Sequence, residues 1–328
     1  MTSSNIIITE SILSNSTGST FSVHCTSSTS YHFYFPVRSM ASTTYQTLRA
    51  HYHAALKRFI AGPRNLEVLS TIPSNQLQEQ KHPSPVPEVL YVLDSSFNPP
   101  TCAHLRIANS ALLEKPSVPS RLLLLLATQN ADKPSKPASF EDRLAMMELF
   151  AQDLWSHLQT SSPAPGNAGL LQIDIGVTKR PYFVDKAAEI EKSDVYPEPL
   201  EQVHLTGYDT LIRIFNPKYY PPEHTLQPLG PFLSQHRLRV TMRPSDEWGS
   251  KEEQEAFLLH LAQGGRENEG GKREWAQRIQ LVEGKKPGDP AVSSTKAREA
   301  IHANPQDLEW LVPDKVREYI LSQRPYAE

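Results

Sequence analysis

The sequence predicts an α/β fold in which a doubly wound parallel sheet is covered by helices on both faces. Short runs of aliphatic and β-branched residues alternate with segments of helical periodicity, as in parallel-sheet proteins. Several runs are almost continuously apolar, which is typical of strands buried on both faces. A polar loop and a helix follow the first of them, and parallel sheets bind ligands outside the carboxyl ends of their strands. The 328 residues fit one enzyme-sized domain with extensions.

Composition divides the chain into four segments. Residues 1–44 are crowded with Ser and Thr and predict a disordered leader, with a translation start at Met40 as the alternative to Met1. Residues 45–87 hold an amphipathic helix, whose apolar residues recur at spacings of three and four, and then a Pro-rich linker. The compact domain is expected near residue 88 and extends to 322, and 323–328 form a tail.

Strand and helix candidates fill the compact domain. The strand candidates are Val89–Leu93, Arg121–Ala127, Leu170–Val177, Val203–Thr206, Leu238–Met242 and Ile279–Val282. A helix begins at Phe140, with Ser139 as its N-cap and Asp142 three residues later. Residues 246–290 form a charged insertion, with a helical stretch at 251–263, which predicts a solvated surface excursion. A lid or a docking surface is the alternative.

Charge and cysteine content exclude several functions. The chain has 33 basic and 36 acidic residues, so its net charge of -3 gives no field for holding nucleic acid. Two cysteines, Cys25 and Cys102, make neither a disulfide framework nor a four-cysteine zinc site, and they indicate a reducing compartment. The longest apolar run, Leu122–Ala127, is too short for a membrane helix. We therefore expect a cytoplasmic protein without a membrane partner, and the nucleus remains open.

The first candidate strand runs into the segment that carries most of the chemistry. It ends at Asp94, and the loop after it leads to His104 in the first turn of a helix. Free backbone N–H groups and the helix dipole make such a position receptive to phosphate, and the histidine adds a positively charged or an N–H donor. The alternative is a surface histidine in an ordinary strand-to-helix turn.

A second cluster opens a helix near the end of the chain. Ser293, Ser294 and Thr295 precede Lys296 and Arg298. Their hydroxyl and N–H groups can face an anion, and Arg298 lies one turn onward. The alternative is that the serines only cap the helix and the basic side chains are solvated.

Taken together, the two clusters resemble a known family. The segment SSFNPPTCAHL at 95–105 resembles the GxFxPxTxxHL motif of nicotinamide mononucleotide adenylyltransferases, and SSTKAR at 293–298 resembles their ISSTxxR motif. Weaker similarities follow in the family's order over about 88–322: Asp132-Lys133 with Phe140–Met147, Arg180–Asp185, Gly207-Tyr208-Asp209, Arg243-Pro244 and Trp310–Ile320. The resemblance implies a single Rossmann-like catalytic domain of the nucleotidyltransferase superfamily, with an N-terminal extension.

The resemblance also implies an activity, which is adenylyl transfer from MgATP to nicotinamide mononucleotide by in-line attack, giving NAD and pyrophosphate. It implies His104, Thr101 and Arg298 as catalytic residues, with the Thr101 hydroxyl as a weaker phosphate contact. The implied ATP-binding residues are Ser95, Ser96, Phe97, His104, Lys133, Gly207, Asp209, Ser293, Ser294 and Arg298. For the acceptor, Arg243 is expected, with Tyr182 or Trp248 as an aromatic face for the cationic ring.

Magnesium is expected to be held by ATP oxygens and water, so no protein metal site is implied. Two departures affect the assignment: Ser95 stands where the family has glycine, and Ser245 replaces the glycine of an RPG motif. They leave open a slow ATPase, a nucleotide-binding interaction protein, or another acceptor such as nicotinate mononucleotide or phosphopantetheine. Assembly into a homo-oligomer is compatible with the family.

Overall fold

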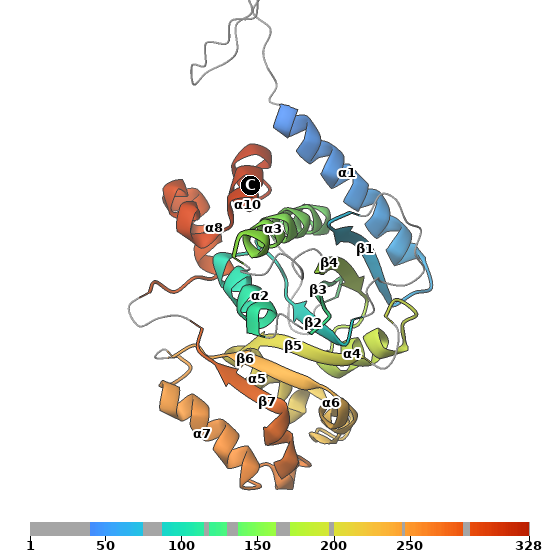
Figure 1. Cartoon of the computed structure of the whole chain (residues 1–328), viewed down its shortest axis with the longest axis vertical. Coiled ribbons are helices and arrows are strands. Elements are labelled where there is room, and N and C mark those ends of the chain that lie inside the picture. Colours follow the sequence, from blue (N-terminus) through green and yellow to red (C-terminus); the bar gives the residue numbers. More distant parts are fainter. Residues whose placement is uncertain are drawn as a thin grey trace, which may run out of the picture.

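In the part of the chain that the structure describes, a seven-stranded sheet runs in the order β1-β4-β3-β2-β5-β6-β7 (Figure 1). The strands are β1 (Leu66–Ile72), β2 (Val89–Asp94), β3 (Ser120–Ala127), β4 (Gln172–Thr178), β5 (Glu201–Gly207), β6 (Arg237–Thr241) and β7 (Ile279–Val282). Strands β2 to β7 are parallel, and β1 pairs with β4 in the antiparallel direction. The predicted fold class is therefore confirmed, and each of the six strand candidates corresponds to a strand.

This computed structural model describes residues 40–74, 87–114, 118–129, 137–161, 171–196, 200–244, 247–284 and 289–327. Most of the predicted leader, most of the Pro-rich linker, Lys133 and Ser245 lie outside the described residues.

Helices cover both faces of the sheet because alternate strand residues point to opposite sides. In β2, Tyr91 and Leu93 join one core cluster, whereas Leu90 and Val92 join another. The first face is covered by α1 (Met40–Ala61), α2 (Cys102–Glu114), α3 (Phe140–Ser161), α8 (Ser294–Ala303), α9 (Leu308–Leu311) and α10 (Asp314–Gln323). The opposite face carries α4 (Phe183–Lys192), α5 (Tyr208–Ile214) and α6 (Gly230–Gln235), and α7 (Lys251–Ala262) packs against α5 and a 3-10 turn.

Two boundaries differ from the sequence prediction. The ordered body does not begin near residue 88, because β1 at 66–72 already belongs to the sheet. The insertion at 246–290 is not a solvated excursion, since it supplies β7 and buries Leu261 and Trp275. The charged residues of α7 are exposed, as expected, but the segment as a whole closes the sheet edge next to β6.

The predicted N-terminal helix docks through polar as well as apolar contacts. In α1, the Tyr52 hydroxyl donates to Glu148 of α3 at 2.6 Å and lies 2.8 Å from the Ser70 hydroxyl of β1. Arg49 donates to Asp142 at 2.8 Å. These bonds join α1 to both the sheet and α3, so the helix is part of the folded domain.

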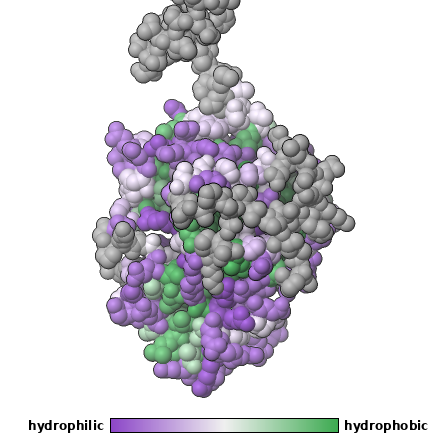
Figure 2. Space-filling model, viewed as in Figure 1, coloured by the Kyte–Doolittle hydropathy of each residue, from purple (hydrophilic) through white to green (hydrophobic). Residues whose placement is uncertain are grey.

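Among the described residues, no helix combines the length and apolarity needed to cross a membrane. On the face drawn in Figure 2, the coloured side chains are mostly hydrophilic, and apolar side chains gather at the lower end of the molecule, where α7 lies. Leu259 on α7 is 59% exposed.

Candidate active site

The candidate site lies where the chain reverses its direction across the sheet. From β2 the chain moves outward to β3 and β4, and from β5 it moves the other way to β6 and β7. Ligands of doubly wound sheets bind at this switch point, outside the carboxyl ends of the strands. The first motif follows β2 and the Gly207–Asp209 segment follows β5, so the topology brings both to the same crevice.

His104 is held in one orientation by the residue that begins its helix. The backbone N–H of Thr101 donates to Nδ1 at 3.0 Å, and the Thr101 hydroxyl lies 2.9 Å from the same nitrogen. The bond resembles the capping-box contact in which the third helical residue reaches back to the N-cap. Because Nδ1 accepts, the proton of the neutral ring is on Nε2, which lies 3.0 Å from the Ser95 hydroxyl.

Burial lowers the pKa of His104 to about 4, so the ring is neutral at pH 7. Of the two roles that the sequence left open, the structure favours the N–H donor over the positive charge. Thr101 is only 1% exposed and its hydroxyl contacts the ring, so it orients His104.

Phe97 packs its ring against the ring of His104. It is fully buried with a φ of 45°, and its ring lies 5.3 Å from the His104 ring and 6.4 Å from Phe150. The positive φ turns the backbone so that the exposed Ser96 stands on the solvent side while Phe97 enters the core. Ser95 does not have a positive φ, so the backbone at this position accommodates a side chain.

The second motif meets the first at the backbone of Asn98 and Pro99. Arg298 donates from Nη1 to the Asn98 carbonyl at 2.7 Å, and the Ser294 hydroxyl donates to the Pro99 carbonyl at 2.8 Å. Ser293 caps α8 by accepting the N–H of Lys296. Ser293 thus caps the helix, and Ser294 and Arg298 bring the start of α8 beside the start of α2.

The Gly207–Asp209 segment forms the next wall. Arg243 donates to the Asp209 carboxylate at 3.3 Å. A Cβ at position 207 would lie 2.6 Å from the same carboxylate, so glycine lets the Asp209 side chain take this position. Arg243, expected on the acceptor side, is therefore joined to a residue expected at the nucleoside.

A cleft of about 160 Å³ lies between these elements. Its lining combines apolar side chains with two arginines: Ala103, Arg106, Ile107, Gly207, Thr241, Met242, Arg243, Pro244, Gly284, Pro290, Ala291 and Val292. Tyr182 and Trp248 are not among these described lining residues. Tyr182 precedes α4, and Trp248 packs against the core cluster around α5 and α7.

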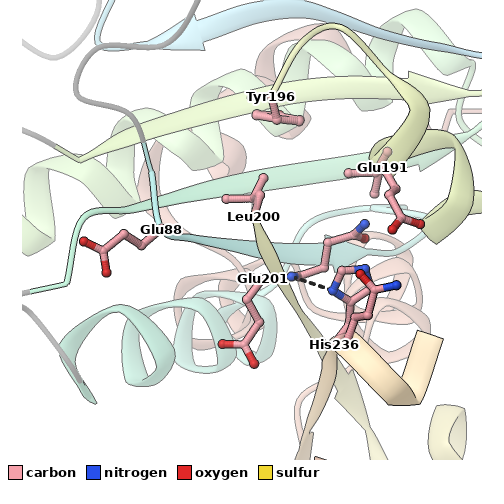
Figure 3. Close-up of a pocket in the computed structure, with 9 residues that line it drawn as sticks. Glu88, Glu191, Tyr196, Leu200, Glu201 and His236 are labelled. Carbon is pink, nitrogen blue, oxygen red and sulfur yellow. Dashed lines mark hydrogen bonds between the residues drawn. The ribbon is translucent and has the colours of Figure 1, made fainter. Parts of the chain in front are cut away.

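A larger hollow of about 500 Å³ lies at the opposite end of the strands (Figure 3). Its lining includes Glu88 and Glu201, which flank the amino ends of β2 and β5, and His236, which accepts the N–H of Gln202. Glu201 is already paired with Arg237 at 2.6 Å. Because neither motif reaches this end of the sheet, size alone does not make it the site.

Two features of the site were missed by the sequence analysis. Lys186 on α4 forms an ion pair of 2.6 Å with Asp94, the residue directly before Ser95. Gln254 on α7 is completely buried and holds the segment after β6, where it accepts from the Arg243 N–H at 3.0 Å and donates to the Trp248 carbonyl at 3.2 Å. No local pattern signals either contact.

Comparison with known proteins identifies a relative. No family model matches the chain. A Schizosaccharomyces pombe protein described as a "putative nicotinamide mononucleotide adenylyltransferase" is 33% identical over 240 residues, which are 72% of this chain and 86% of that protein.

Among solved structures, a Plasmodium falciparum nicotinic acid mononucleotide adenylyltransferase complexed with NaAD matches with a TM-score of 0.46 and 12% identity, over 72% of this chain and 96% of that one. Its complex with APC matches with a TM-score of 0.45, 11% identity and the same coverage. The assignment rests on the sequence relative, whose similarity spans most of both chains. This chain belongs to the nicotinamide mononucleotide adenylyltransferase family.

Proposed function

We propose that this protein transfers the adenylyl group of MgATP to the 5′-phosphate of nicotinamide mononucleotide, which forms NAD and releases pyrophosphate. The observation that carries the proposal is that the starts of α2 and α8, at Cys102 and Ser294, meet at the Asn98 and Pro99 carbonyls. Membership of the family supports the same reaction.

The two helix starts supply the donors that a triphosphate needs. The first N–H groups of a helix have no partner within the helix and point along its axis, and they bind anions well. At α8 these are the N–H groups of Ser294 and Thr295, because the Lys296 N–H is taken by Ser293. Arg298 adds a planar guanidinium, which can bind two phosphate oxygens together. The β- and γ-phosphates are proposed to lie here.

The cleft beside Gly207 suits the nucleoside. Ile107, Met242 and Val292 provide apolar walls for a flat base. The Asp209 carboxylate, next to Gly207, can accept hydrogen bonds from ribose hydroxyls. Arg243 holds that carboxylate from the other side. This arrangement would place the α-phosphorus between the cleft and the start of α2.

The reaction requires alignment more than acid–base chemistry. An oxygen of the acceptor phosphate attacks the α-phosphorus in line, a new P–O bond forms, and the bond to the bridging oxygen of pyrophosphate breaks. Both substrates are anions, so the protein has to hold them together and neutralise the charge that builds on the leaving group. The donors at α2 and α8 would do this without a covalent intermediate.

Magnesium enters this proposal as part of the MgATP substrate. In the described part of the chain, no group of three or more His, Cys, Asp or Glu side chains is arranged to hold a metal ion. Magnesium usually keeps several waters and binds through substrate phosphates. For the nicotinamide ring, the proposed aromatic face is Tyr182, which precedes α4, or Trp248, in the turn before α7.

The test uses the full chain with MgATP and a panel of acceptors. NAD and pyrophosphate are measured with nicotinamide mononucleotide, nicotinate mononucleotide, phosphopantetheine or water as the acceptor, beside a His104→Ala variant. We expect equal amounts of NAD and pyrophosphate, and a loss of about 10²- to 10³-fold in rate for the variant. Product with another acceptor alone, or phosphate release without any dinucleotide, would overturn the proposal.

A further inference from the structure

The hydrogen bonds around His104 point to a second residue at the reacting phosphate. The Thr101 N–H bonded to Nδ1 leaves one ring proton, and that proton is on Nε2. Nε2 is directed at the Ser95 hydroxyl at 3.0 Å. The single donor of the imidazole is therefore already used within the protein.

Ser95 is fixed at the end of β2, where its hydroxyl can accept a hydrogen bond from His104 and donate one to a ligand. Its backbone N–H donates to the Leu125 carbonyl at 3.2 Å, which anchors the residue to β3. The residue is only partly buried, at the carboxyl end of β2. Because the oxygen accepts from Nε2, its own O–H is available to donate to a ligand.

We propose that the Ser95 hydroxyl is the group that contacts the substrate phosphate, and that His104 is a positioning residue behind it. This inference rests on the proposed function. A hydroxyl that accepts one hydrogen bond donates a second one more strongly, because bonds in a chain polarise one another. The series of hydrogen bonds leads from the Thr101 N–H through the neutral His104 ring and the Ser95 hydroxyl to a phosphate oxygen. No proton is transferred, and both N–H and O–H bonds remain intact.

The hydroxyl fills the space in front of Nε2, so direct contact between the ring and a phosphate would require the Ser95 side chain to rotate away. If the hydroxyl makes the contact, its removal slows the reaction. If the ring makes the contact, removal of the hydroxyl leaves the rate unchanged or raises it.

The experiment compares Ser95→Ala, Ser95→Gly and Ser95→Thr with the wild type. Rates of NAD formation from MgATP and nicotinamide mononucleotide are measured, together with ATP affinity by calorimetry and thermal unfolding. We expect Ala and Gly to lower kcat by about 10²- to 10³-fold, as much as His104→Ala, and ATP affinity by about tenfold, because a hydrogen bond to a charged group is lost. Thr keeps the hydroxyl and should retain most of the activity. Ser234→Ala, on the exposed side of α6, is the control.

The double variant Ser95→Ala/His104→Ala tests whether the two residues act through one series of hydrogen bonds or make two independent contacts. Residues that act in series give non-additive losses, so the double variant should be about as slow as the slower single variant. Losses that multiply, or a Ser95→Gly enzyme as fast as the wild type, would overturn the inference. If the wild type binds ATP but forms no NAD, the proposed function fails, and the ATP affinity of Ser95→Ala then decides the role of the hydroxyl by itself.

Discussion

The guanidinium of Arg298 donates to the carbonyl of Asn98 at 2.7 Å and so joins the two motifs of the site. The same guanidinium lies 3.2 Å from the Thr295 hydroxyl within its own helix. Arg298 thus has a structural bond to each side of the crevice and can still present its remaining N–H groups to an anion, because a guanidinium has five donors. This bond holds the start of α8 against the loop after β2.

Replacement of Arg298 should lower the rate of catalysis. We expect Arg298→Met to lower kcat/KM by about 10²- to 10³-fold, because a charged donor to the leaving group is removed. Arg298→Lys should fall in between, since an ammonium cannot bind two oxygens in a plane. Steady-state kinetics with varied MgATP measure the effect. The matched control is Arg278→Lys, at the amino end of β7, and wild-type kinetics for the Arg298→Lys variant would contradict the phosphate role.

The ring of His104 should titrate far below an ordinary histidine. Burial lowers its pKa to about 4 from an unfolded value of 6.5. NMR of the ring nitrogens should show the Nε2–H tautomer throughout pH 6 to 8, with protonation only near pH 4. A ring that titrates near 6.5, or one with the proton on Nδ1, would contradict the bond from Thr101.

The same shift predicts the direction of a pH effect on stability. The unfolded chain takes up a proton at about 6.5 and the folded chain only at about 4, so the unfolded state binds more protons between these values. The contribution of His104 is complete above about pH 6.5 and is lost as the pH falls toward 4. His204, whose pKa burial lowers to about 3, acts in the same direction. Urea unfolding at pH 7.5 and 5 should show a smaller decrease for His104→Gln than for the wild type.

The strands and the helix starts could be predicted from the sequence because their signals are local. Buried parallel strands read as apolar runs, and Ser139 and Ser293 cap their helices as their positions indicate. Strand β1 was missed because it is an edge strand with mixed exposure, separated from β2 by the Pro-rich segment. Gln254 was missed because a glutamine in a charged helix gives no sign of burial.

Gln254 should control the segment that leads from β6 to α7. Gln254→Leu removes the partner of the Arg243 N–H and of the Trp248 carbonyl, so the loop that carries Arg243 loses its anchor. We expect the KM for ATP to rise several-fold with a smaller change in kcat, because Arg243 holds the Asp209 carboxylate. Gln263→Leu, on the exposed end of the same helix, is the control. Equal kinetics for the two variants would show that the loop does not depend on Gln254.

Lys186 should neutralise the Asp94 carboxylate, so that its negative charge does not repel the phosphates. Lys186→Met leaves the Asp94 carboxylate uncompensated one residue before Ser95, so both anionic substrates should bind about tenfold more weakly. Asp94→Asn in the same chain removes that charge and should restore binding. Lys192→Met, at the exposed end of α4, serves as the control. If the double variant binds ATP as poorly as Lys186→Met alone, the lysine acts in some other way.

Asp174 should be the residue that most strongly stabilises the packing of β1 against the rest of the sheet. It is fully buried in β4 and accepts hydrogen bonds from Arg121 at 2.7 Å, Thr71 at 2.6 Å and Tyr196 at 2.8 Å. Asp174→Ala leaves the buried Arg121 charge without its partner, so we expect a loss of about 3–5 kcal/mol in the free energy of unfolding. Asp194→Ala, on the surface, should change it by less than about 0.5 kcal/mol. Urea denaturation of both variants measures the difference, and a similar stability for the two would mean that the network adds nothing to the fold.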